Sequence, residues 1–196
     1  DSERIIFVDN YMYQSGLKAG KYRTRITIMN SDGSSKFSLN DKQLWTRRSS
    51  SFILQALAEP YYRYPSWSPD GEHIMFSAGT GQEQDIYVKP ISGLLDQDPR
   101  ELHHIDGLES HPVWAPDGKS IIFTSRRSGG PNIVVWHQDP DADPSKLVLG
   151  TRTTNVIYLR ESDSGHAEYP SWSPDGKRIA FISAKADSYD IYIADI

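Results

Sequence analysis

The apolar residues of this chain come in short runs that turn residues interrupt. The longest uninterrupted runs have four residues, as at 5–8 and 133–136. Runs this short, bounded by Gly, Pro, Asn and Asp, are typical of strands covered on both faces rather than of amphipathic helices. A bilayer span needs about 18 or more apolar residues. We therefore predict an all-β fold of short strands without a membrane-spanning segment.

One phrase, Tyr/His-Pro-x-Trp-Ser/Ala-Pro-Asp-Gly, occurs at 64–71, 111–118 and 169–176. Each copy has a Phe nine residues after its Trp, followed by an Asp/Asn-Ile-Tyr/Val-Val/Ile run centred twenty residues after the Trp. The segment 1–8 matches 175–182, which indicates a fourth, incomplete copy at the start. A spacing shared across twenty positions predicts one structural unit repeated along the chain.

The unit is read as a set of antiparallel strands. Ser-Pro-Asp-Gly is typical of a type I turn with a bulge, in which Gly118 and its equivalents take a positive φ. We assign strand A to Pro-x-Trp, B to the Phe run and C to the Ile-Tyr run. Strand D is placed at Ser51–Leu57, Arg100–Ile105 and Val156–Arg160, and the first B–C hairpin carries a longer loop, Asn10–Tyr22.

Short sheets that bury both faces on the next copy predict a β-propeller of four-stranded antiparallel blades, with about four copies visible. The predicted divisions are a partial blade 1–63, blades 64–110 and 111–168, and a partial blade 169–196. Incomplete copies at both ends predict that the chain is part of a larger ring of six or more blades, with apolar blade faces exposed at its ends.

The repeated phrase, followed by Asp/Asn-Ile-Tyr-Val, resembles the TolB-like β-propeller repeat, which also occurs in gating domains of large peptidases. The resemblance covers about four copies. It implies an extracytoplasmic, often periplasmic, setting. Propellers that resemble TolB have six blades and an N-terminal α/β domain, and this chain departs from that pattern. The motif specifies the blade far more closely than the function, because one fold carries many activities.

Composition removes several classes of partner. Lys and Arg number 21 against 26 Asp and Glu, for a net charge of −5, and the longest runs of basic residues are pairs. Nucleic acid is therefore not an expected partner. Cysteine is absent, which excludes disulfides, thiolate metal sites and a cysteine nucleophile.

No catalytic constellation is encoded, so we expect no enzyme activity in this chain. Gly-x-Ser-x-Gly and His-Glu-x-x-His are both missing. Adjacent His103 and His104 would point to opposite faces of a strand. Residues 139–143 resemble the first residues of a calcium-binding loop, but the residues that follow do not supply the Gly and the Glu that such a loop requires. We expect no cofactor, with weak calcium binding at this segment as the alternative. The recurring Trp and the turn Asp are interpreted as packing and turn residues.

The remaining candidate for a binding site is one end of the sheets. Connections alternate between the two ends of an antiparallel meander, so the D–A and B–C loops of every blade share one end. The predicted binding residues gather there: Tyr11, Tyr13, Tyr62, Arg63, Tyr64, His111, Arg126, Arg127, His166, Glu168 and Tyr169. Exposed Tyr and Arg are the residues that protein interfaces favour. Ordinary solvated loops are the alternative interpretation.

The leading hypothesis is a non-catalytic binding module that presents this Tyr/Arg-rich end to a protein or an extracellular ligand. The alternative is the gating domain of a peptidase or other hydrolase whose catalytic part lies outside this chain. A lyase with a central metal is disfavoured, because the His residues do not recur at equivalent places.

Overall fold

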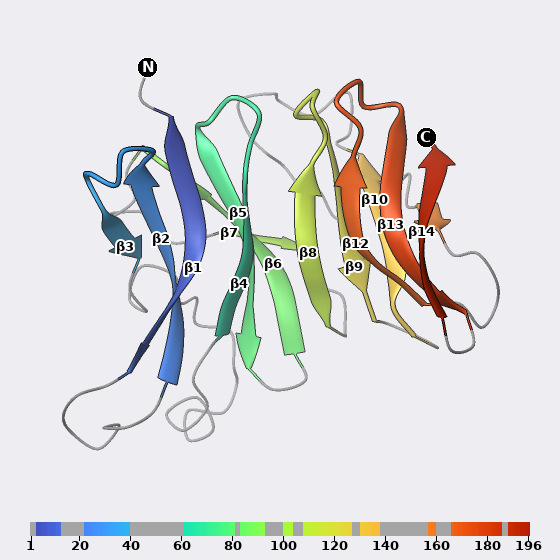
Figure 1. Ribbon diagram of the computed structural model, residues 1–196, viewed down its shortest axis with the longest axis horizontal. Coiled ribbons are helices and arrows are strands. Elements are labelled where there is room, and N and C mark those ends of the chain that lie inside the picture. Colours follow the sequence, from blue (N-terminus) through green and yellow to red (C-terminus); the bar gives the residue numbers. More distant parts are fainter. Residues whose placement is uncertain are drawn as a thin grey trace.

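The computed structural model describes residues 3–12, 22–39, 61–80, 83–92, 100–103, 108–126, 130–137, 157–159, 166–185 and 188–196. These ranges contain fourteen strands in four antiparallel sheets. Figure 1 shows the sheets side by side in chain order, as blades of a fan. The predicted all-β propeller fold is confirmed. Within the described ranges, no helix has the length and apolarity needed to cross a bilayer.

Each sheet is a meander in which neighbours in sequence pair in space. The first contains β1 (Arg4–Met12), β2 (Tyr22–Asn30) and β3 (Phe37–Leu39). The second contains β4 (Tyr61–Trp67), β5 (His73–Thr80), β6 (Glu83–Pro90) and β7 (Arg100–His103). The third contains β8 (Glu109–Trp114), β9 (Ser120–Ser125), β10 (Asn132–His137) and β11 (Ile157–Leu159), and the fourth contains β12 (His166–Trp172), β13 (Arg178–Lys185) and β14 (Ser188–Asp195).

The pairing register follows the spacing seen in the sequence. Phe76 pairs with Tyr87 and Phe181 with Tyr192, and in each pair the rings stack with centroids 6.0 and 5.9 Å apart. In the first copy the equivalent partner of Phe7 is Thr27. The longer loop of that copy therefore leaves the register of its hairpin unchanged. Its predicted bounds, Asn10–Tyr22, are too wide, because residues 10–12 pair with residues 22–24 in the extended strands β1 and β2.

The Pro-Asp-Gly turns that join strands A and B have the expected geometry. Gly71, Gly118 and Gly176 each have a φ of 70°, and each backbone N–H donates to the carbonyl three residues earlier at 2.9 to 3.0 Å. That left-handed conformation favours glycine. The predicted positive φ at Gly118 is confirmed.

A β-bulge at the x-Pro dipeptide was not predicted. In β4, β8 and β12 the register shifts at residues 64–65, 111–112 and 169–170, so that two residues oppose a single residue on the next strand. Proline lacks the N–H that a regular ladder needs, and a bulge tolerates that loss. The residue before each Pro has a φ between 53° and 56°. The bulge therefore turns that side chain away from the direction a regular strand would give it.

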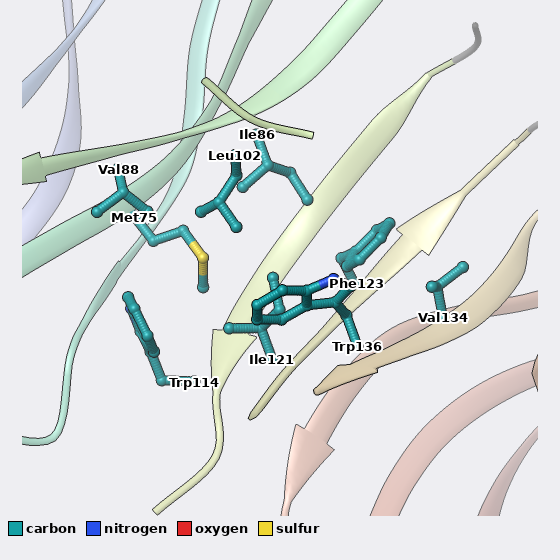
Figure 2. Close-up of a cluster of buried hydrophobic side chains, with 9 residues drawn as sticks. All are labelled: Met75, Ile86, Val88, Leu102, Trp114, Ile121, Phe123, Val134 and Trp136. Atoms are coloured by element: carbon teal, nitrogen blue, oxygen red, sulfur yellow. The ribbon is translucent and has the colours of Figure 1, made fainter. Parts of the chain in front are cut away.

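The core lies between neighbouring sheets. Figure 2 shows the cluster between the second and third sheets, which buries nine side chains: Met75, Ile86, Val88, Leu102, Trp114, Ile121, Phe123, Val134 and Trp136. Burial of one such side chain stabilises the fold by roughly 1.5–3 kcal/mol. Two equivalent clusters join the first sheet to the second and the third to the fourth, and Trp67 and Trp172 pack against them. The prediction that the recurring Trp is a packing residue is confirmed.

Some boundaries differ from the sequence prediction. The third strand of the first sheet is Phe37–Leu39, whereas strand D was placed at Ser51–Leu57, which lies outside the described residues. Strand A of each copy begins two or three residues before the predicted blade boundary, at Tyr61, Glu109 and His166. The sequence prediction started each strand next to its Pro, because Pro usually ends regular pairing. The bulge lets pairing continue on the other side of the Pro.

Candidate binding site

Three equivalent residues from three different sheets meet at one end of the fold. The ring centroids of Tyr64 and His111 are 3.6 Å apart, and those of His111 and Tyr169 are 4.2 Å apart. Each of these residues occupies the first position of its bulge, and each has a left-handed φ. Strands β4 and β8, and β8 and β12, lie against each other. The bulges therefore direct one ring from the first strand of each of these sheets into a shared aromatic group, which we call the aromatic stack although the His111 and Tyr169 rings meet edge-on at 64°.

The middle ring of this stack is neutral near pH 7. Burial lowers the pKa of His111 from its ordinary value of 6.5 to about 4. The nearby Glu168 carboxylate raises this pKa, whereas the guanidinium groups of Arg126 and Arg63 lower it. The His111 Nδ1 lies 3.0 Å from the Ser110 hydroxyl oxygen. Its buried Nε2 makes no hydrogen bond to any described residue.

An ion pair lies beside the stack. A terminal nitrogen of Arg126, at the end of β9, donates to a carboxylate oxygen of Glu168 in β12. The Arg126 side chain is half exposed, and that of Glu168 is about one-fifth exposed. The pair therefore joins the third and fourth sheets where β9 finishes and β12 begins, and Figure 1 shows these strand ends at the bottom of the view.

A cavity of about 270 Å³ opens next to this ion pair. It is lined by Arg126, Pro131, His166, Glu168, Tyr169, Ile182 and Tyr189. The Tyr169 ring thus serves both as the end of the aromatic stack and as a wall of the cavity. Tyr189 is 79% exposed, and Tyr169 is 51% exposed.

Next to the cavity, the segment before β10 packs closely against the start of β12. Gly130 has a φ of 125°, and a Cβ at this position would lie 2.8 Å from the His166 ring. The Ala167 N–H donates to the Pro131 carbonyl at 2.8 Å, which links β12 to the start of β10. Gly130 is therefore required both for its conformation and for the close approach of His166.

The structure brings together most of the predicted binding residues that it describes. Arg63, Tyr64, His111, Arg126, His166, Glu168 and Tyr169 lie around the stack and the cavity. Tyr11 lies in the first sheet, with the Arg25 guanidinium 4.9 Å from its ring centroid. Figure 1 places that sheet at the opposite end of the row from β12.

Tyr62 was predicted as an exposed binding residue, and this prediction is wrong. Its exposed fraction is 0%, and it packs edge-on against Phe76 in the core between the first two sheets. Strand alternation explains this: Tyr61 points outward, so its neighbour points inward. Tyr13, Arg127 and the acidic segment 139–143 lie outside the described residues.

Sequence reasoning missed three cavity residues: Pro131, Ile182 and Tyr189. Ile182 looked like an ordinary core position in strand B. Tyr189 lies in the β13–β14 hairpin, which is a B–C connection. The rule that B–C and D–A loops share one end of the sheets could therefore have placed it at the binding end. Among the described residues, no group of three or more His, Asp or Glu side chains is arranged to hold a metal ion.

Comparison with known proteins identifies the fold. Residues 46–142 match the family described as the TolB beta propeller domain. The structure of TolB from Acinetobacter baumannii is 22% identical, with a TM-score of 0.59, over 88% of this chain and 35% of that one. A TolB-type protein of Agrobacterium tumefaciens is 20% identical, with a TM-score of 0.59, over 89% of this chain and 53% of that one.

The similar structures also include a hydrolase. A puromycin-hydrolysing peptidase of Mycobacterium tuberculosis is 16% identical, with a TM-score of 0.59, over 88% of this chain and 24% of that one. No curated protein sequence matches the chain. The chain spans about half or less of the length of these solved proteins, and at these identities the similarity concerns the fold. The resemblance carried by the repeated phrase is confirmed by the family match over residues 46–142, and the similar structures show that the chain has the β-propeller fold.

Proposed function

We propose that this chain is a non-catalytic binding module that presents the end formed by its D–A and B–C connections to a protein partner. The observation that carries the proposal is the Tyr64–His111–Tyr169 stack with the Arg126–Glu168 pair beside it. Tyrosine and arginine are enriched among the residues that contribute most to protein interfaces.

The strands that hold the aromatic stack support the proposal. Each ring of the stack is held by a bulged strand in a sheet rather than by a free loop, so little side-chain freedom is lost when a partner binds. Tyr61 and Tyr169 are about half exposed and flank this surface. Rigid aromatic side chains with exposed faces supply contact area at a low entropic cost.

The proposal includes an extracytoplasmic setting, which the similarity to TolB proteins supports. It also includes the absence of catalysis by this chain. His111 is the best placed general base, but its pKa of about 4 leaves it a weak base, and its ring is enclosed between two tyrosines.

A gating domain of a larger hydrolase is the second candidate. It is favoured by the similarity to the puromycin-hydrolysing peptidase, of which this chain covers 24%. In that case the same end of the sheets would face a catalytic domain, and the two candidates differ in whether the partner belongs to the same polypeptide.

Site-specific cross-linking tests the proposal. A benzophenone amino acid replaces Tyr61, which is 49% exposed at the proposed binding end, or Lys119, which is exposed in the A–B turn at the opposite end. We expect one dominant protein adduct from position 61 in a periplasmic extract, suppressed by excess unlabelled protein and missing from position 119.

Adducts of equal yield from both positions would contradict a dedicated binding end. A parallel assay on peptide, ester and glycoside substrates should show no turnover. Reproducible turnover that the substitution His111→Gln abolishes would replace the binding module with an enzyme.

A further inference from the structure

The cavity between the third and fourth sheets has its own chemistry, distinct from that of the aromatic stack. Its apolar walls come from Pro131, Ile182 and the rings of Tyr169 and Tyr189. A cavity of roughly 150 Å³ with apolar walls is large enough to bind benzene. At about 270 Å³, this cavity has room for one large apolar side chain.

The charge beside the cavity is predominantly positive. Arg126 and Glu168, which line it, are paired with each other, and the additional positive charge comes from Arg63, which lies close enough to His111 in the neighbouring stack to lower its pKa. The chain as a whole carries a net charge of −5. The three charged side chains that act on His111 therefore carry one surplus positive charge, which favours an acidic partner over a basic one.

Arg126 can bind a second carboxylate while it stays paired with Glu168. A guanidinium has five N–H donors, and the Glu168 contact involves one of its terminal nitrogens. The side chain is 49% exposed, so an incoming group can reach it. Arginine pairs with carboxylates in a planar, often bidentate geometry.

The cavity is also built to keep its shape. Gly130 lets His166 approach its backbone closely, and the Ala167–Pro131 hydrogen bond fixes the two sheets against each other at this point. A pocket that exists before binding lets an anchoring side chain enter without reorganising the protein.

We infer that this cavity receives one aromatic or large aliphatic side chain of a partner protein, with an adjacent acidic side chain of the same segment bound to Arg126. The inference rests on the proposed function and specifies the chemistry of the partner. It assigns the anchor to the seam between the third and fourth sheets rather than to the Tyr64–His111–Tyr169 stack.

Capped dipeptides test this chemistry directly. The probe is acetyl-Asp-Phe-amide, compared with acetyl-Asn-Phe-amide, acetyl-Lys-Phe-amide and acetyl-Asp-Gly-amide, in titrations followed by the backbone amide NMR signals of the whole chain. We expect saturable shifts at Ile182 and Tyr189 and none at Asp117 in the opposite turn. Affinity should fall about threefold or more from the Asp to the Asn probe and further for the Lys probe. The Gly probe should not bind.

Variants of the protein show which residues bind the Phe and which bind the Asp of the probe. Tyr189→Ala should weaken the Asp-Phe probe about threefold or more, whereas Ile193→Ala on the same strand should have no effect, because Ile193 does not line the cavity. Arg126→Gln should remove the preference for Asp over Asn. Glu168→Gln should strengthen binding of the Asp probe, because it removes a repelling charge. Tyr189 and Ile193 are both more than 60% exposed, so both variants should fold.

Equal affinities for the Asp and Asn probes, or loss of binding in Ile193→Ala as in Tyr189→Ala, would overturn the inference. A partner cross-linked from position 61 while no probe shifts Ile182 or Tyr189 would overturn this inference and leave the proposed function intact. Probe binding as expected, together with no specific adduct, would support the cavity chemistry and contradict the protein-binding function.

Discussion

The third and fourth sheets are built from the same repeat, yet their corresponding outward faces differ in environment. In β10, Ile133 and Val135 are fully buried against the fourth sheet. The matching positions in β14, Ile191 and Ile193, are 78% and 67% exposed. Figure 1 shows β12 to β14 at the end of the row, and no described sheet lies over β14.

This difference shows that each copy of the repeat carries apolar residues at these positions, whether or not they are buried in that copy. In the second sheet, Ile86 and Val88 hold the same positions and are 1% and 4% exposed against the third sheet. The opposite face of β14 behaves normally, since Tyr192 and Ala194 pack toward the third sheet. The pattern predicts which residues are apolar, and the neighbouring sheet decides which of them are buried.

The largest effect should come from removing one side chain of the buried pair. Ile133→Ala deletes three buried carbon atoms and leaves a cavity, so the free energy of unfolding should fall by about 2–5 kcal/mol. Ile191→Ala is the matched control and should change it by less than about 0.5 kcal/mol. Urea denaturation followed by Trp fluorescence measures both. Equal losses would show that Ile191 is covered in solution.

The next effect concerns the turns, which are alike in the two sheets. Gly118 and Gly176 both have a φ of 70°, and a Cβ at Gly118 would meet no atom within 4 Å. Gly118→Val should therefore destabilise the fold by about 1–3 kcal/mol through backbone strain alone. Gly118→Asn should cost clearly less, because asparagine tolerates the left-handed region.

Thermal melting of the two variants separates strain from packing. A Val variant as stable as the Asn variant would contradict the strained turn. The same pair of substitutions at Gly176 should give the same ranking in the last sheet.

A smaller effect distinguishes the middle ring of the aromatic stack from its neighbours. Burial lowers the pKa of His111 to about 4, below the 6.5 of an unperturbed His, so the unfolded chain binds a proton more readily than the folded one. The free energy of unfolding should therefore fall as the pH drops from about 6.5 to about 4. Solvent screens this half-buried group, so the loss should be about 1 kcal/mol.

Denaturation at pH 7 and pH 4 in matched salt measures this contribution. His111→Tyr introduces the residue found in both neighbouring copies and should remove about 1 kcal/mol of the acid-dependent loss. An unaltered pH dependence in His111→Tyr would show that the stack is open to solvent.

The repeat itself allowed much of the fold to be predicted. The fixed distance from Trp to Phe and on to Tyr placed the B–C register correctly, because pairing of Phe76 with Tyr87 and of Phe181 with Tyr192 follows directly from equal hairpin lengths. The turns followed from local chemistry, since glycine adopts the left-handed position at the lowest steric cost.

The candidate site was predicted less completely, because it depends on departures from regular pairing. The bulge at His111-Pro112 redirects the His111 ring into the stack, and strand alternation alone does not anticipate that change. Tyr62 and Tyr64 looked alike in sequence, yet one is core and the other belongs to the stack. The cavity is lined by Pro131 and Ile182, which belong to different repeats and come together only in the folded chain.

The smallest effect tests whether the two turns are equivalent in energy as well as in shape. In the last sheet the Ser173 hydroxyl accepts the Arg178 N–H at 3.0 Å and donates to Asp175, which lowers the pKa of that carboxyl. The third sheet has Ala115 at this position, although Asp117 still accepts the Lys119 N–H at 2.8 Å.

Ala115→Ser should therefore add a hydroxyl between Asp117 and the start of β9 and raise the free energy of unfolding by about 0.5–1 kcal/mol. Ser173→Ala should lower it by a similar amount in the last sheet. In an Asp117→Ala background the gain from Ala115→Ser should shrink, because the hydroxyl loses its acceptor, and a double-mutant cycle in urea measures that coupling. If Ala115→Ser and Ser173→Ala changed the free energy of unfolding by equal amounts in opposite directions, the two turns would be interchangeable. The contrast between the two sheets would then come from the packing of Ile133 and Ile191 alone. A destabilised Ala115→Ser variant would instead show that this buried position cannot accommodate the hydroxyl and that the two turns differ in their surroundings.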